Sequence, residues 1–267
     1  RADGDFTFTD PDSEILKVRK NNSFHRNNIL FTGDYTFSGR TSLSLLHRTV
    51  FHKQGSPGPI SFPSPDAMIK NNNHYTHLRL VSLIHPLLTF KTEMFHHRLK
   101  NRYTDPSAFI PAAFTHENTS MGSKVQLMYR YSDKLLLNSG LEYKQDDLES
   151  TSFHFRNRTV FSLFFHGEFQ LSGRVLNLKL LPAVRVDDYS DFGRDLSPKL
   201  GLMLKFPTLP GCSFLANMSS AYRAPTFNDL YWPEDSYTRG NPGLKPETAS
   251  GYDLTLMLGE PLLPGAA

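Results

Sequence analysis

Apolar and polar side chains alternate one by one along most of the chain, which is the pattern of β-strands with one apolar and one polar face. In one segment Ile29, Phe31, Tyr35 and Phe37 share a face, and the residues between them are mostly polar. Further segments repeat the alternation, with apolar positions at Val125, Leu127, Tyr129 and Tyr131; Leu135, Leu137, Leu141 and Tyr143; Phe161, Leu163, Phe165, Phe169 and Leu171; Leu200, Leu202, Leu204 and Phe206; and Leu254, Leu256 and Leu258. Because helical periodicity is nearly absent, the sequence predicts an all-β, antiparallel protein of about twelve strands.

The connections between these strands alternate between short and long. Tight turns built from Gly, Pro, Ser or Asp fit at residues 37–40, 85–88, 131–134, 171–174 and 206–212. Longer polar connections are expected at residues 54–72, 101–115, 146–152, 188–195 and 222–254. Short periplasmic turns at one end and long extracellular loops at the other are typical of an outer-membrane barrel. We therefore predict part of an antiparallel transmembrane β-barrel.

The two faces of the predicted strands support a barrel over a soluble sandwich. Aromatic residues beside the short turns suit an interfacial girdle, and they are Tyr35, Phe37, Tyr131, Phe169 and Phe206. The opposite faces carry charges, among them Arg130, Glu142, Glu168, Arg185 and Lys199. Both inner faces of a sandwich should be apolar, whereas a barrel lumen is wet.

Composition excludes several other classes of protein. No segment approaches the ~18 consecutive apolar residues of a membrane-spanning helix. The net charge is only +3, with both signs interspersed, so nucleic acid is not an expected partner. The single cysteine, Cys212, excludes an intrachain disulfide framework. The chain starts at Arg1 without a leader and ends just after an apparent strand, so we expect an internal fragment.

Three stretches in the second half of the chain read "PAVRVDDYSDFGRDLSPKLGL", "AYRAPTFNDLYW" and "GNPGLKPETASGYDL". They resemble the distal barrel of TonB-dependent outer-membrane transporters, and the "RAP" and "NPxLKPE" pairing is the most specific part. "GDFTFTDPDS" and "GSPGPISFPSP" look like earlier barrel segments of the same family, so the resemblance spans residues 1–267. It implies a barrel of about 22 strands closed by a plug. The N-terminal plug, the TonB box and the C-terminal strands are expected to lie outside this sequence.

The resemblance implies an active transport receptor, not an enzyme, in the bacterial outer membrane. Extracellular loops would capture a scarce large solute, and the TonB complex would drive its import through the missing plug region. The expected ligand is cobalamin or a ferric siderophore, and "PTFNDLYW" before "GNPGLKPE" favours cobalamin. Heme receptors of the family that this sequence resembles carry a histidine between the two motifs. Heme is therefore disfavoured, because no histidine lies between Arg223 and Asn241. The expected partners are therefore outer-membrane lipid, the TonB complex and this ligand, with no cofactor. A passive channel or adhesin without a plug is the alternative.

The stretch from Tyr222 to Leu254 is the candidate site. Its prolines fix φ and interrupt strand pairing, so we expect a long loop with a defined path. We assign a bracing role to the residues of the two motifs, namely Arg223, Pro225, Asn241, Pro242, Lys245 and Glu247. Charge pairing among Arg223, Lys245 and Glu247 near the barrel mouth is one interpretation, and direct contact with a ligand is the other. Asn241-Pro242 between two glycines is suited to a tight turn.

The same loop supplies the predicted ligand contacts. They are Asn228, Asp229, Tyr231, Trp232 and Tyr237. Trp232, the only tryptophan, lies beside a tyrosine, and such aromatic pairs supply large, rigid binding area. Packing onto neighbouring loops is the competing interpretation.

Other apparent motifs are assigned no chemistry. The pairs His96/His97 and His74/His77 have odd spacing, so the members of each should point to opposite faces of a strand. Residues 187–191 ("DDYSD") offer oxygen ligands for Ca²⁺, but a solvated acidic loop is the expected interpretation. No phosphate loop or catalytic motif is found, and no metal site is predicted.

Overall fold

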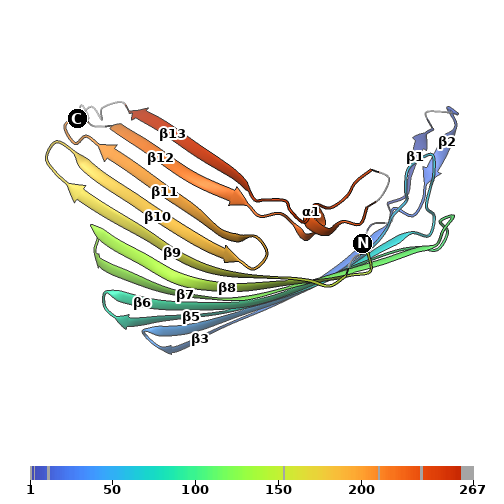
Figure 1. Cartoon of the computed structure of the whole chain (residues 1–267), viewed down its shortest axis with the longest axis horizontal. Coiled ribbons are helices and arrows are strands. Elements are labelled where there is room, and N and C mark those ends of the chain that lie inside the picture. Colours follow the sequence, from blue (N-terminus) through green and yellow to red (C-terminus); the bar gives the residue numbers. More distant parts are fainter. Residues whose placement is uncertain are drawn as a thin grey trace, which may run out of the picture.

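Eleven consecutive antiparallel strands form one curved sheet, in which each strand pairs with its neighbours in sequence (Figure 1). This computed structural model describes residues 2, 4–10, 13–152, 154–209, 211–234 and 237–259. The strands of the sheet are β3 (Phe24–Ser38), β4 (Thr41–Gly55), β5 (Met68–His85), β6 (Leu88–Asp105), β7 (Ala112–Ser132), β8 (Leu135–Ser150), β9 (Arg156–Ser172), β10 (Asn177–Tyr189), β11 (Gly193–Lys205), β12 (Cys212–Arg223) and β13 (Glu247–Leu258). A separate hairpin pairs β1 (Phe6–Thr9) with β2 (Leu16–Arg19).

The convex face of the sheet carries an apolar band beside the short turns. Register places the predicted apolar positions of neighbouring strands side by side, such as Leu141 of β8 opposite Leu163 of β9. These side chains remain exposed, with Leu163 at 54% and Leu254 at 74%. β3 has 15 residues and β9 has 17, and their apolar side chains face outward in this way. Long strands with an outward apolar face match a lipid-facing surface. The predicted apolar faces are confirmed.

The concave face is polar, as predicted. All five of the inward charges predicted from the sequence lie on this face by register, and some pair across strands. Arg185 Nη1 lies 3.2 Å from Glu142 Oε2, and Lys179 Nζ lies 2.9 Å from Glu168 Oε2. The odd-spaced histidines also separate, since His74 contacts Thr49 on the convex face and His77 approaches Glu93 on the concave face.

The strands are longer and most connections shorter than predicted. β7 has 21 residues, and residues 106–111, 151–155 and 190–192 alone connect the strands on either side of them. The expected long loops at 101–115, 146–152 and 188–195 were therefore wrong. Above the apolar band polar side chains pair across the strands, for example Asn71 with Asn101, so the backbone ladder continues in water. Polarity marked the end of the band, not the end of the strand.

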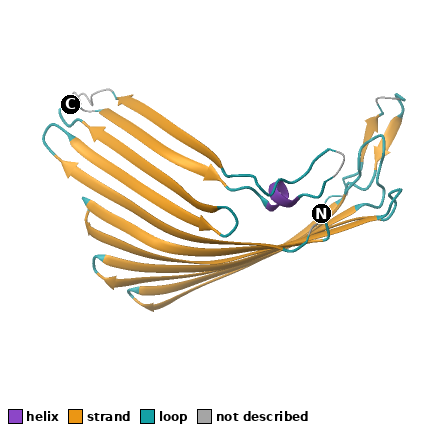
Figure 2. Cartoon of the chain, in the orientation of Figure 1, coloured by secondary structure: helices purple, strands orange, loops and turns teal. Residues whose placement is uncertain are grey.

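Two connections at the end of the sheet opposite the short turns do remain long. Residues 56–67 join β4 to β5 and receive hydrogen bonds from β2 and the segment after it, including 2.8 Å from Asn21 Nδ2 to the Ser64 carbonyl. Residues 224–246, which we call the mouth loop, join β12 to β13 and contain the helix α1 (Phe227–Tyr231), purple in Figure 2. The long connection expected at residues 222–254 is therefore present as the shorter mouth loop, and it contains a helix that the sequence analysis did not predict. Among the described residues, no helix is long and apolar enough to cross a membrane.

Candidate ligand-binding site

The mouth loop begins with a helix that its own sequence caps. Thr226 Oγ1 accepts a hydrogen bond from the Asp229 backbone N–H, and Asp229 Oδ2 accepts one of 2.8 Å from the Thr226 N–H. This reciprocal capping box satisfies backbone donors that a helix start leaves unpaired. The hydrogen bonds from the Thr226 backbone and side chain, together with the nearby Arg223 guanidinium, hold the pKa of Asp229 below its usual value. Asp229 is therefore ionised at neutral pH and fixes the helix start.

The second half of the loop folds back onto α1. The Gly240 N–H donates to the Trp232 carbonyl over 2.9 Å, and the Asn241 N–H donates to the Asp229 carbonyl over 2.8 Å. The Leu244 N–H then donates to the Asn241 carbonyl, which closes the tight turn predicted around Asn241 and Pro242. A Cβ at Gly240 would lie 2.5 Å from the Trp232 backbone nitrogen, so this close approach requires glycine.

Two arginines of β9 attach the mouth loop to the concave face of the sheet. Arg158, only 8% exposed, donates from Nη1 to the Pro225 carbonyl over 2.9 Å and from Nε to Asp191 Oδ2 over 2.8 Å. Its guanidinium lies 5.1 Å from the centre of the Phe227 ring. The Arg156 guanidinium lies 4.3 Å from the centre of the Tyr231 ring. Cation–π contacts and buried hydrogen bonds thus hold α1 against the concave face of the sheet.

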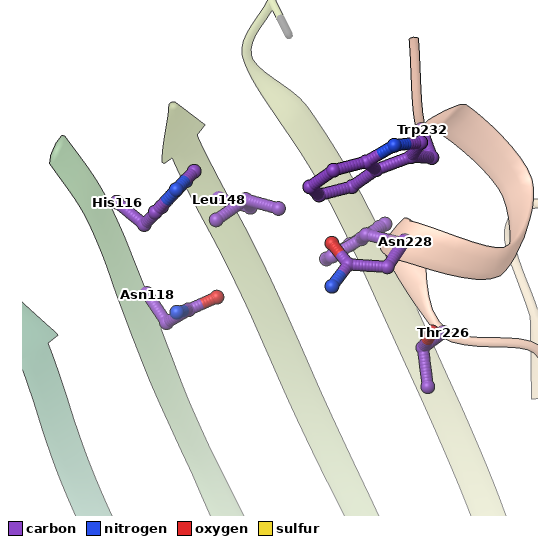
Figure 3. A pocket seen from close by; sticks show the side chains of 7 residues that line it. His116, Asn118, Leu148, Thr226, Asn228 and Trp232 are labelled. Atoms are coloured by element: carbon purple, nitrogen blue, oxygen red, sulfur yellow. The ribbon is translucent and has the colours of Figure 1, made fainter. Parts of the chain in front are cut away.

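A cavity of about 300 Å³ lies between the mouth loop and the strands β7 and β8, whose residues in the lining we call the wall residues (Figure 3). His116 and Asn118 enter it from β7 and Leu148 from β8, while the loop contributes the remaining lining residues, which are Thr226, Phe227, Asn228 and Trp232. None of the seven is Asp, Glu, Lys or Arg. The cavity therefore offers amide, hydroxyl and imidazole groups beside aromatic surface, which suits a ligand part that is uncharged and rich in hydrogen-bonding groups.

The known proteins that this chain resembles share its architecture. The family model described as "TonB dependent receptor-like, beta-barrel" matches residues 2–259. The chain belongs to this family. Its members are transport receptors of the outer membrane. The antiparallel sheet of this receptor chain is accordingly part of the family's β-barrel, as predicted.

Two relatives of the receptor chain are vitamin B12 transporters named BtuB. The protein from Photobacterium profundum is 30% identical over 52% of this chain and 23% of its own length. The protein from Vibrio vulnificus is 40% identical over 72 residues, which are 27% of this chain and 11% of its own length.

Solved receptor structures share the fold at low sequence identity. A mutant of the ferric enterobactin receptor PfeA from Pseudomonas aeruginosa gives a TM-score of 0.70 at 14% identity, over 87% of this chain and 40% of its own. A double mutant of the Serratia marcescens hemophore receptor HasR, in complex with HasA and heme, gives a TM-score of 0.71 at 15% identity. This match covers 90% of this chain and 43% of the HasR chain. This receptor chain thus spans less than half the length of each relative.

The structure separates the receptor residues predicted to bind ligand. Asn228 and Trp232 line the cavity, whereas Asp229 caps α1 and Tyr231 packs against Arg156. Tyr237 is 95% exposed and is not part of the lining. The wall residues His116, Asn118 and Leu148 did not emerge from the sequence, because alternation gives the face of a strand and not what folds over it.

The predicted bracing residues also divide. Arg223 Nη1 lies 3.2 Å from Glu247 Oε1, and these residues pair in register where β12 ends and β13 begins. Both side chains are well exposed, so the pair contributes only about 0–1 kcal/mol. Among the described residues Lys245 forms no ion pair, and the Pro225 carbonyl makes the buried contact with the wall.

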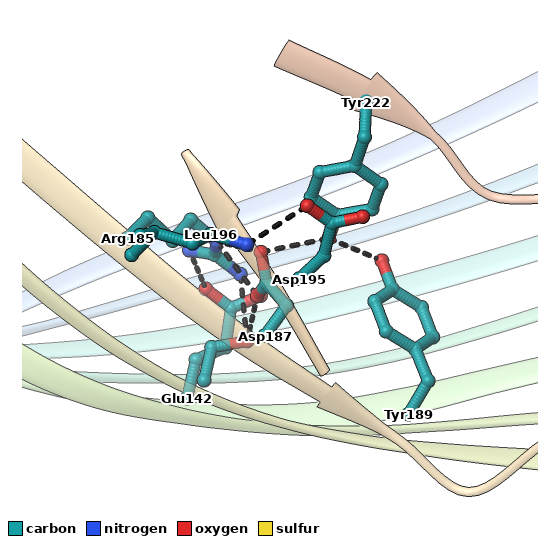
Figure 4. Close-up of polar contacts among 8 residues, drawn as sticks. Glu142, Arg185, Asp187, Tyr189, Asp195, Leu196 and Tyr222 are labelled. Atoms are coloured by element: carbon teal, nitrogen blue, oxygen red, sulfur yellow. Dashed lines mark hydrogen bonds and ion pairs between the residues drawn. The ribbon is translucent and has the colours of Figure 1, made fainter. Parts of the chain in front are cut away.

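A network of polar side chains joins β8, β9 and β10 to Tyr222, which lies at the end of β12 next to the mouth loop (Figure 4). Asp187 accepts hydrogen bonds from Arg185, from Ser162 and, over 2.8 Å, from the Tyr222 hydroxyl. The Tyr222 and Tyr189 hydroxyls lie 2.8 Å apart.

This arrangement bears on the acidic stretch at residues 187–191. Asp187 points to Arg185, Asp188 to Arg194 and Asp191 to Arg158, so the three carboxylates pair with different arginines. In the described part of the chain, no group of three His, Cys, Asp or Glu side chains is placed to hold a metal ion.

Proposed function

We propose that this chain is part of the barrel of an outer-membrane receptor that captures cobalamin and imports it with TonB coupling. The observation that carries the proposal is the uncharged lining of the cavity beneath the mouth loop. The periphery of cobalamin bears neutral amide groups, which His116, Asn118 and Asn228 suit as hydrogen-bonding partners. Trp232 adds apolar surface for the macrocycle. A ferric catecholate is anionic and would favour a basic lining. The two similar vitamin B12 transporters support the same ligand.

The coupling to TonB is proposed for the whole protein. This chain supplies barrel strands and a mouth loop, and it covers 40% of the PfeA chain and 43% of the HasR chain. We propose that a plug, a segment that contacts TonB and further barrel strands belong to the same protein outside residues 1–267. Ligand capture at the mouth loop would then precede displacement of the plug.

The first experiment titrates the full-length protein with cyanocobalamin and with a ferric catecholate. We expect saturable binding of cyanocobalamin and weaker binding of the ferric complex. Tighter binding of the ferric complex would overturn the ligand assignment. Uptake by cells with and without TonB completes the test, since TonB-independent uptake would indicate a passive channel.

The second experiment replaces Trp232 with Ala in the full-length protein. Truncation of a large aromatic contact typically costs about 2 kcal/mol at a binding hot spot, so we expect affinity for cyanocobalamin to fall roughly 30-fold. Leu209→Ala, in the short turn at the far end of the strands, is the control and should leave affinity unchanged. Equal affinities of the two variants would remove Trp232 from the site.

A further inference from the structure

A row of basic side chains crosses three strands on the convex face of the sheet. Lys53 of β4 is the register partner of Lys70 of β5, and Lys70 is the register partner of Arg102 of β6. All three side chains are exposed. Because neighbouring strands lie about 4.8 Å apart, the backbones of the three residues fall within about 10 Å. We call these residues the basic row.

The structure places no acidic partner on the basic row within the part of the chain that it describes. Glu117 on the same face pairs instead with Arg98 and Lys100, in the latter case with 3.2 Å between Nζ and Oε2. Among the described residues, none of Lys53, Lys70 and Arg102 takes part in an ion pair. Like charges directly opposite one another destabilise a sheet. An anionic partner outside the described chain would relieve this repulsion.

The position of the row relative to the apolar band identifies that partner. On β6 the exposed convex-face positions run from Met94 of the band through Arg98 and Lys100 to Arg102. Arg102 is eight positions after Met94, which is about 26 Å along the strand and less along the membrane normal because barrel strands tilt. The row therefore lies on the loop side of the band, on the surface that faces lipid and its headgroups.

We propose that the basic row binds phosphate groups of outer-leaflet lipid. Arg102 presents a planar guanidinium that matches phosphate oxygens, and Lys70 and Lys53 on the next two strands add charge beside it. Contact with phosphorylated lipid would neutralise the row and fix the height of the barrel in the membrane. The inference rests on the proposed outer-membrane location, but not on the identity of the imported ligand.

The test measures binding of fluorescent lipid A, a phosphorylated glycolipid, to the purified full-length receptor in a neutral detergent. Each basic side chain near a lipid surface increases the affinity for anionic lipid about fivefold. The triple variant Lys53→Gln, Lys70→Gln, Arg102→Gln should therefore bind lipid A about 100-fold more weakly. The charge-matched control is Lys124→Gln, Lys144→Gln, Lys199→Gln on the concave face, which should bind like the wild type. The charge-conserving variant Lys53→Arg, Lys70→Arg, Arg102→Lys should retain binding.

Two results would overturn the proposal. One is equal binding by the basic-row variant and the wild type, and the other is an equal loss in the concave-face control. Cyanocobalamin titration of the same samples keeps the two proposals separate. A receptor that binds cyanocobalamin but gives either result would retain the proposed function and lose the lipid site.

Discussion

Arg158 connects three parts of the molecule with one side chain. Its Nη1 reaches the Pro225 carbonyl of the mouth loop, its Nε reaches Asp191 between β10 and β11, and its guanidinium faces the Phe227 ring. A lysine could not make these contacts together, because its ammonium group is a compact point charge on a flexible stem. This role could not be predicted from the sequence, since nothing in the alternation distinguishes Arg158 from Arg156.

Replacement of Arg158 with Ala should release the mouth loop. Breaking a buried ion pair typically costs about 3–5 kcal/mol, because the remaining partner stays buried. We expect faster hydrogen exchange across residues 224–246 of the full-length protein, with the central strands unaffected. Arg194→Ala is the control, because the Arg194–Asp188 pair is exposed and should contribute at most about 1 kcal/mol. Exchange that stays slow in the Arg158 variant would contradict the docking role.

Among the elements, strands were predicted better than the loop between them. Strict alternation identified the outward residues of β8 and β9, because a period of two fixes the face of each side chain. It did not fix strand ends, because polar residues continue the ladder above the apolar band. The helix α1 did have a local signal, which was Thr226 followed three positions later by Asp229. Five helical residues are too few for periodicity to reveal.

The fold of the mouth loop depends on Gly240 as an element of backbone packing. In Gly240→Ala the new Cβ would meet the backbone of Tyr231 and Trp232, so the turn must move away from α1. Overpacking of this kind costs about 1–3 kcal/mol. When intact cells are treated with protease, we expect the mouth loop of the Gly240→Ala variant to be cleaved faster than that of the wild type. In Gly243→Ala the nearest atom to the Cβ is Asn241 Oδ1 at 3.4 Å, so this control should be cleaved like the wild type.

For the whole molecule, the two faces of the sheet should tolerate charge very differently. Leu163 lies on the convex face of β9, inside the apolar band, and arginine there should lower the free energy of unfolding by about 2–4 kcal/mol. Gln170→Arg on the concave face of the same strand should change it little, because that face is polar. Urea unfolding of the full-length protein in micelles measures both. Equal destabilisation would mean that the faces are wrongly assigned.

The height of the paired strands above the apolar band has a consequence for how ligand preference changes. His116, Asn118 and Leu148 stand on hydrogen-bonded strands, so three of the seven residues that line the cavity are held by backbone pairing and not by loop conformation. Single substitutions at these three positions would alter the chemistry of the cavity while its outline persists. For the proposed function, preference for a solute would then change by point mutation, without any insertion or deletion in the loops.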